Sequence, residues 1–395
     1  MISRLTNRRD RETQRLAVRT FVSLLEPVID FSLIFGALHI IILGDAVSMQ
    51  ALILAGGKGT RLRPLTMHTP KPIVPIAGRP FLLYQLELLK RADVRDVILS
   101  LSYQPQKIED RLGDGTDFNV RISYAVEVTP LGTAGAYRNA AALISETTVV
   151  FNGDVLTDID MNEVIRFHRE RQAAATIVLT PVPNPTAYGL VETGADGRVR
   201  RFLEKPKPEE VTCDTINAGI YILEPRVLDY VPEGEPFMFE YGVFPQLLER
   251  GEPFYAYTWR GYWRDIGTAA SYLQANIDVL AGAVNLLGRP PAERGDRFDP
   301  AAEIDSVSVV DSSCTVKAGA QIINSVVSRN CLIEENARVE NSVVRGGSRI
   351  GMGSIITGAI IGKGCHIGRA VTVGSRAVLG DKSVVTDYSN VGNEG

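Results

Sequence analysis

Hydrophobic and polar residues follow two different rhythms along this chain, and the change between them falls near residue 290. From residue 50 to about 180, short apolar runs typical of buried strands alternate with segments whose apolar residues recur every three or four positions. Leu82, Leu86 and Leu89 show this helical spacing. The alternation predicts an α/β domain with a mostly parallel sheet, helices on both faces, and ligands at the carboxyl ends of its strands.

These runs place the individual elements of the first part. Strands are predicted at 51–54, 97–101, 120–124, 149–151 and 176–181, and helices at 80–91, 105–112, 133–143 and 161–172. A more strand-rich portion follows, with strands at 189–192, 199–203, 218–223 and 254–259 and a helix at 269–280. The Gly, Pro and Arg residues of 288–300 predict a linker.

Beyond the linker, aliphatic residues recur with a period of 17 residues. The recurring set is Val310, Val316 and Ile322, then Val327, Ile333 and Val339, then Val344, Ile350 and Ile356, then Ile361, Ile367 and Val373. Three short strands per turn, each pointing one aliphatic residue inward, predict a triangular parallel β-helix. The pattern resembles the left-handed hexapeptide-repeat helix.

The repeat also accounts for three of the four cysteines. Cys314, Cys331 and Cys365 share one position of the repeat, and Ser348 occupies that position in the remaining coil. We therefore predict a stack of small core residues rather than a metal site, and reduced thiols suit a cytoplasmic protein.

Composition and charge add two limits. The chain has 395 residues and a net charge of −4, which gives no reason to expect nucleic acid or an anionic membrane as a partner. We expect a main domain at 49–287, the linker at 288–300 and the β-helix at 301–395.

Residues 1–48 differ from the rest. Six arginines precede an apolar stretch from Phe31 to Gly44, which is shorter than a spanning helix of about 20 residues. Met49 stands directly before the first strand. We expect 1–48 to be an artefactual or dispensable extension rather than a membrane anchor.

The residues best suited to bind a ligand follow the first predicted strand, in Gly56-Gly57-Lys58-Gly59-Thr60-Arg61. Glycines let backbone N–H groups approach an anion, and cations then neutralise it, so a nucleoside triphosphate is the expected ligand. The order of residues does not match the Walker loop. It also fails the dinucleotide fingerprint, because Leu62 stands where a third glycine belongs.

The loop continues through Leu62-Arg63-Pro64-Leu65-Thr66 to Pro70-Lys71-Pro72, and the whole segment resembles the signature of the sugar-1-phosphate nucleotidylyltransferases. The resemblance implies a nucleotide site whose residues lie in this loop and in two later segments. In the loop, the implied residues are Leu54, Ala55, Gly56, Gly57, Gly59 and Thr60. The residues implied to recognise the base are Gln104, Pro130, Gly132 and Thr133.

The same resemblance implies the catalytic and metal-binding residues. Arg61 and Lys71 would grip the triphosphate, and Asp154 and Asp265 would hold Mg²⁺, a cation that prefers carboxylate, phosphate and water oxygens. On the sugar side, three later motifs imply four residues. They are Gly189 for close approach of the backbone, Glu204 for sugar hydroxyls, Lys205 for the sugar phosphate and Asn217 as a further contact.

Within the superfamily, Leu131-Gly132-Thr133-Ala134-Gly135 and the β-helix most resemble the mannose-1-phosphate guanylyltransferases. The implied reaction joins GTP and mannose 1-phosphate and releases pyrophosphate. Uridylyl or thymidylyl transfer to glucose or N-acetylhexosamine 1-phosphate is the alternative, and a non-catalytic sugar-nucleotide-binding regulator is another. Acyl transfer by the β-helix is disfavoured because its repeat contains no inserted loop. We expect homo-oligomers formed through the β-helix.

Overall fold

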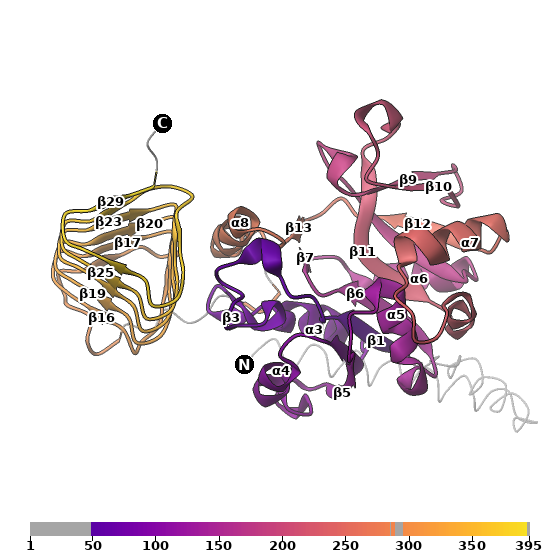
Figure 1. Cartoon of the computed structure of the whole chain (residues 1–395), viewed down its shortest axis with the longest axis horizontal. Coiled ribbons are helices and arrows are strands. Elements are labelled where there is room, and N and C mark those ends of the chain that lie inside the picture. The colour runs from indigo at the N-terminus through magenta and orange to yellow at the C-terminus, as the bar shows by residue number, and fades with distance from the viewer. Residues whose placement is uncertain (1–48, 285, 289–294, 393–395) are drawn as a thin grey trace, which may run out of the picture. The chain divides into compact units, whose positions relative to one another are not determined.

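The computed structural model describes residues 49–284, 286–288 and 295–392, so the expected extension at 1–48 lies outside the described residues (Figure 1). Within them, no helix combines the length and apolar character that crossing a bilayer requires. The first part is built on a nine-stranded sheet whose main path runs β10-β9-β11-β6-β1-β4-β5.

Four parallel strands form the half of this sheet that comes first in the chain. β1 (Met49–Leu54) lies between β4 (Asp96–Leu101) and β6 (Thr147–Asn152), and β5 (Arg121–Val126) pairs with β4. The carboxyl ends of β1 and β6 are in register, with Leu54 opposite Asn152. Residues that follow these two strands therefore meet at one edge of the sheet.

The second half of the sheet is antiparallel where it joins the first. β11 (Thr215–Leu223) pairs antiparallel with both β6 and β8 (Ala175–Pro181), and β12 (Phe254–Thr258) pairs parallel with β8. β9 (Gly189–Thr193) and β10 (Val199–Glu204) form an antiparallel pair beyond β11. The predicted mixed, mostly parallel sheet is confirmed.

Helices cover both faces, as the alternation of buried residues in β1 requires. Ala51 and Ile53 belong to one hydrophobic core together with α3 (Leu82–Arg91), α6 (Met161–Glu170) and α8 (Ala269–Leu280). Leu52 points to a second core with α5 (Gly132–Asn139) and α7 (Phe244–Glu249). Successive strand residues face opposite sides, so one apolar run serves two layers.

Several predicted bounds shift. The helix predicted at 80–91 begins at Leu82, because Arg79–Pro80 forms β3 and pairs with β2 (Pro75–Ile76). The helix predicted at 133–143 is α5 followed by a 3-10 turn at Ala141–Leu143. Helix α4 (Pro105–Leu112) lies where it was predicted.

Two short strands that the hydrophobic pattern did not predict build a separate ladder. β7 (Val155–Thr157) pairs antiparallel with β13 (Trp263–Asp265), and Asp265 stands opposite Val155. This ladder joins residues more than a hundred positions apart, directly beyond the carboxyl end of β6.

The repeat region folds as predicted, into a left-handed parallel β-helix whose strands stack in three sheets (Figure 1, orange to yellow). The three sheets are β14-β17-β20-β23-β26-β29, β15-β18-β21-β24-β27 and β16-β19-β22-β25-β28. Their bounds are Glu303–Ile304, Val309–Val310, Thr315–Val316, Gln321–Ile323, Val326–Val327, Leu332–Ile333, Arg338–Glu340, Val343–Val344, Arg349–Ile350, Ile355–Thr357, Ile360–Ile361, His366–Ile367, Thr372–Val373, Val378–Leu379, Val384–Val385 and Asn390–Val391.

The pairing follows the predicted period. Val310, Val327, Val344 and Ile361 lie directly above one another, each paired with a residue 17 positions away. In the last coil the step lengthens, since Ile361 pairs with Leu379, 18 positions on.

The cysteine stack is confirmed. Cys314, Cys331 and Cys365 are buried and carry free thiols. Each thiol donates to a backbone carbonyl of the next coil, and the Ser348 hydroxyl donates in the same way to Gly362 O at 2.7 Å. Serine and cysteine are therefore interchangeable in shape and in hydrogen bonding at this position.

We predict that Ser348→Cys lowers the free energy of unfolding only slightly, whereas Ser348→Val lowers it by about 1–3 kcal/mol. Valine would leave Gly362 O and the Cys365 N–H, which donates to Ser348 Oγ at 3.0 Å, without a partner in the core. Denaturant unfolding of both variants measures the difference, and equal stabilities would contradict the account.

Candidate active site

A cavity of about 400 Å³ opens at the carboxyl ends of β1 and β6. Most of the predicted nucleotide and catalytic residues line it, which places them in one site. They are Leu54, Ala55, Gly56, Gly57, Gly59, Thr60, Arg61, Lys71, Pro130, Gly132, Thr133 and Asp154. Because α5 begins at Gly132, the first backbone N–H groups of a helix also lie at this cavity.

The glycine loop takes its shape from close contacts. Gly59 has φ +59°, a left-handed conformation that favours glycine, and its carbonyl accepts a 2.7 Å hydrogen bond from the Thr66 hydroxyl. At Gly56, an added Cβ would lie 2.9 Å from Glu127 Oε1. An added Cβ at Gly57 would have no described atom within 4 Å, so the space beside this part of the backbone is open to a ligand.

Two cations and two carboxylates meet beside this loop. Lys71 Nζ contacts Asp154 Oδ2 at 2.9 Å, and the Arg61 guanidinium lies 4.0 Å from Asp265 Oδ2. The β7–β13 ladder brings the carboxylates together, since Ile266 N donates to Asp154 O at 2.9 Å. Sequence positions 111 residues apart are thereby joined through backbone hydrogen bonds.

The local electrostatics suit a cation between these carboxylates. Burial and the negative charge of Asp154 raise the pKa of Asp265, while Lys71 and Arg61 oppose this shift. Asp265 Oδ1 is buried and has no hydrogen-bond partner among the residues that the structure describes. An unpaired carboxylate oxygen beside a second carboxylate fits a divalent cation bound through one or two carboxylates, with substrate phosphates completing its shell.

A buried carboxylate that was not predicted, Glu127, also lines the cavity. It follows β5, and its two oxygens accept hydrogen bonds from the Ser100 hydroxyl and from Leu131 N, both at 2.9 Å. These bonds fix the carboxylate between the glycine loop and the turn before α5, where each oxygen keeps a further lone pair.

Gln104, predicted to read the base, is not among the residues that line the cavity. It precedes α4 with φ +50°, and its amide donates to Met67 O at 3.4 Å. Its side chain therefore contacts the outer side of the segment that follows the glycine loop.

The predicted sugar-side residues form a second group on β9, β10 and β11. Gly189 pairs with Glu204, and an added Cβ at Gly189 would lie 2.8 Å from Glu204 Oε2. Lys205 N donates to Tyr188 O at 2.9 Å, and the Asn217 amide donates to the Tyr221 hydroxyl at 2.9 Å.

A second unpredicted carboxylate, Glu240, connects the two groups. It lies in the π-helix Phe239–Val243, and its Oε2 accepts from the Thr133 hydroxyl at 2.9 Å. Burial raises the pKa of Glu204, and the negative charge of Glu240 raises it further. π-Helical turns are frequent at functional sites.

Comparison with known proteins agrees with this geometry. A nucleotidyl transferase family model matches residues 50–282, more than half of the chain, and a model of the β-helix domain of the EIF2B epsilon subunit matches 293–391. The chain belongs to the nucleotidyl transferase family.

Individual relatives of this nucleotidyl transferase are similar over most of its length. A mannose-1-phosphate guanylyltransferase of Mycobacterium tuberculosis is 38% identical over 79% of this chain and 79% of its own. A UTP–glucose-1-phosphate uridylyltransferase of Synechocystis is 34% identical over 70% of this chain and 82% of its own. The solved structure of a putative glucose-1-phosphate thymidylyltransferase from Bacillus anthracis matches with a TM-score of 0.55 and 26% identity, over 60% of this chain and 96% of its own.

Both unpredicted residues of this nucleotidyl transferase had a weak signal in the sequence. Glu127 directly follows a strand and precedes the turn that contains Gly132. Glu240 is the one charged residue in the otherwise apolar or aromatic run from Phe237 to Phe244. A charged residue in either position indicates a polar partner, but only the fold shows which one.

Proposed function

We propose that this chain transfers the guanylyl group of GTP to mannose 1-phosphate and releases pyrophosphate. The observation that carries nucleotidyl transfer is the meeting of the glycine loop with Arg61, Lys71 and Asp154 in one cavity, with Asp265 beside the Arg61 guanidinium. A sugar phosphate oxygen attacks the α-phosphorus of the nucleotide, and the bond from that phosphorus to the β-phosphate bridging oxygen breaks. Two anions must meet, so positioning and charge compensation supply most of the catalysis.

The named residues divide this work. Asp154 and Asp265 would hold Mg²⁺, which supplies positive charge at the phosphate oxygens when bound. Arg61, with its side chain 68% exposed, has the freedom to follow the departing pyrophosphate, whereas Lys71 is held by its ion pair. Glu204 would accept from sugar hydroxyls, and Lys205 would pair with the sugar phosphate.

The buried carboxylate of Glu127 supports guanine as the base. Guanine presents two neighbouring donors, its ring N1–H and its exocyclic amino group, and a carboxylate can accept from both at once. Uracil and thymine present a single N–H between two carbonyl oxygens, and a carboxylate repels those oxygens. The guanylyltransferase relative from M. tuberculosis is consistent with this choice.

Uridylyl or thymidylyl transfer to glucose 1-phosphate is the second candidate, because the Synechocystis and B. anthracis proteins carry those names. Pyrophosphate release decides between the candidates. The assay crosses GTP, UTP, dTTP, ATP and CTP with mannose, glucose and N-acetylhexosamine 1-phosphates. The largest kcat/KM with GTP and mannose 1-phosphate supports the proposal. A larger value with UTP or dTTP contradicts it, and no turnover with any pair favours a regulator.

Glu127→Gln tests the reading of the base. We predict that kcat/KM for GTP falls by about 10–100-fold, because the amide presents an N–H group to one of guanine's donors. Glutamine can still accept from Leu131 N and donate to Ser100, so the fold should be kept. Equal losses for GTP and UTP would contradict a role in base choice.

Asp154→Asn and Asp265→Asn test the cation site. We predict that each lowers Mg²⁺-dependent turnover by at least about 100-fold, because one charge of the pair is lost. Asp160→Asn is the matched control, since Asp160 caps α6 and asparagine caps helices equally well. Wild-type rates in either of the first two variants would show that the site is assigned wrongly.

Two further parts of the proposal concern the whole protein. We propose a cytoplasmic enzyme, where its nucleotide substrate is available, and a homo-oligomer formed through the coils of the β-helix. Sedimentation of the full chain at monomer mass would overturn the second part.

A further inference from the structure

Segment 65–69 lies in the sequence between the two proposed catalytic cations, Arg61 and Lys71, and it packs against Gly59 of the glycine loop. Thr66 donates its hydroxyl hydrogen to Gly59 O at 2.7 Å. An added Cβ at Gly59 would lie 3.1 Å from Thr66 Cγ2 and 3.3 Å from Lys71 Cβ, so these residues are in close packing. The position of the loop therefore depends on the position of segment 65–69.

This segment is held from two sides. On the side of α4, the Tyr103 hydroxyl donates to Met67 O and Lys107 Nζ donates to His68 O, and both bonds are solvent-exposed. On the other side, two side chains of the β-helix reach it through buried or partly buried bonds. The bonds from the β-helix to segment 65–69 are thus less exposed to solvent than those from the side of α4.

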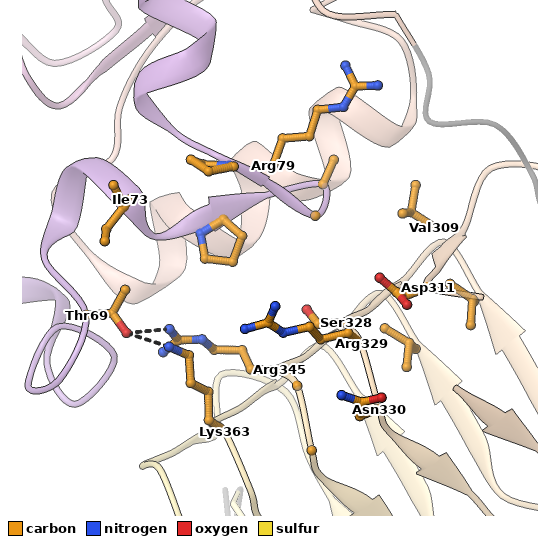
Figure 2. A pocket seen from close by; sticks show the side chains of 18 of the residues that line it. Thr69, Ile73, Arg79, Val309, Asp311, Ser328, Arg329, Asn330, Arg345 and Lys363 are labelled. Atoms are coloured by element: carbon orange, nitrogen blue, oxygen red, sulfur yellow. Dashed lines mark hydrogen bonds between the residues drawn. The ribbon is translucent and has the colours of Figure 1, made fainter. Parts of the chain in front are cut away.

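Arg345 makes two of these bonds. One guanidinium nitrogen donates to Leu65 O and the other to Thr69 Oγ1, both at 3.1 Å. Lys363 Nζ donates to the same Thr69 oxygen at 2.9 Å (Figure 2). Figure 2 shows both side chains converging on Thr69 from neighbouring coils.

The β-helix itself does not require an arginine at this position. The same position of the repeat is Ser328 in the preceding coil and Gly362 in the following coil. Yet the Arg345 side chain is only 1% exposed, and its Nε is buried with no hydrogen-bond partner in the described part of the chain. A buried charge is costly unless its bonds compensate for it, so its contacts with Leu65 and Thr69 are the gain to explain.

The charges around Arg345 are only partly balanced. Asp381 Oδ1 lies 3.6 Å away, and Lys363 brings a second positive charge beside it. Burial and the charge of Arg345 both lower the pKa of Lys363. Arg345 and Lys363 thus bring two positive charges to Thr69 Oγ1, with Asp381 as the neighbouring carboxylate, and their bonds hold segment 65–69.

We propose that Arg345 is a positioning residue for nucleotidyl transfer, through which the β-helix holds the glycine loop in place. The inference rests on the proposed function of the cavity, and it gives the β-helix a catalytic role beyond assembly. Arg345 itself does not touch the cavity that holds the catalytic residues.

Thr69→Val and Arg345→Lys test the inference in the full chain. Valine keeps the shape of Thr69 and removes the accepting oxygen, and lysine keeps the charge but cannot make both bonds. We expect kcat/KM for the nucleotide to fall by about 10–100-fold in each variant, because small misplacements of a loop are costly in catalysis. The KM for the sugar 1-phosphate should change little. The variant Thr69→Ser, which retains the hydroxyl group, should have the wild-type kcat/KM.

The double variant separates positioning from a general loss of stability. Both single changes remove the hydrogen bond between Arg345 and Thr69, so we expect the double variant to lose no more than about 3-fold beyond the worse single variant. Arg329→Lys is the matched control: Arg329 lines a second cavity, which Thr69, Arg345 and Lys363 also line, and no described hydrogen bond joins the Arg329 side chain to segment 65–69. It should keep wild-type kinetics.

Two results would overturn the inference: a Thr69→Val variant with wild-type kcat/KM, or fully additive losses. If Arg345→Lys fails to fold, as thermal unfolding would show, the comparison of Thr69→Val with Thr69→Ser still decides. The kinetics use whichever nucleotide and sugar phosphate the wild-type protein turns over best, so a wrong base leaves this test intact. Should the wild-type protein turn over no pair, calorimetric affinity for Mg²⁺–GTP and Mg²⁺–UTP replaces kcat/KM, with the same ranking of variants expected for the nucleotide that binds.

Discussion

The juxtaposition of Asp154 and Asp265 is the constraint on which the rest of this structure depends. Two carboxylates held close together repel each other, and the repulsion is strongest where water is excluded. Backbone hydrogen bonds of the β7–β13 ladder bring the backbones of the two residues together. Lys71 and Arg61 compensate part of the charge. The remainder favours a bound cation and, through it, a polyphosphate.

The geometry of the loop follows from this need for charge compensation. Lys71 must reach Asp154 while the Arg61 side chain remains free to move. The backbone between these two residues therefore has to be held in place by contacts with other parts of the protein. Thr66 fixes it to Gly59, and the β-helix side chain of Arg345 fixes it at Leu65 and Thr69. A repeat domain outside the cavity thereby contributes, in our proposal, to the position of the loop.

The sequence predicted the parts of the fold that have a period. Alternating strands and helices gave the mostly parallel sheet, and the 17-residue spacing gave the coil positions of Val310, Val327, Val344 and Ile361. It did not predict β7 and β13, because strands of three residues carry too little pattern to recognise. The bounds of α3 shifted because Pro80 extends a short β-pair.

The same limit applies to the site. Motifs with ordered residues singled out Arg61, Lys71 and Asp154, and in the structure these residues line one cavity together with the glycines. Glu127 and Glu240 were missed because a single carboxylate has no spacing to recognise, and its role depends on partners distant in the chain such as Ser100 and Thr133. Arg345 was missed for the same reason, since its partners lie about 280 residues away. The roles of all the predicted site residues, those on the sugar side and Gln104 included, stay predictions.

The fate of the α-phosphorus tests the central claim most directly. The protein is incubated with mannose 1-phosphate, Mg²⁺ and GTP labelled with ³²P at either the α or the γ position, and the products are separated. The account predicts that the α label enters a sugar nucleotide while the γ label leaves as pyrophosphate. Label from the α position that stays in GTP, or that appears only in free guanosine nucleotides, would contradict nucleotidyl transfer to the sugar.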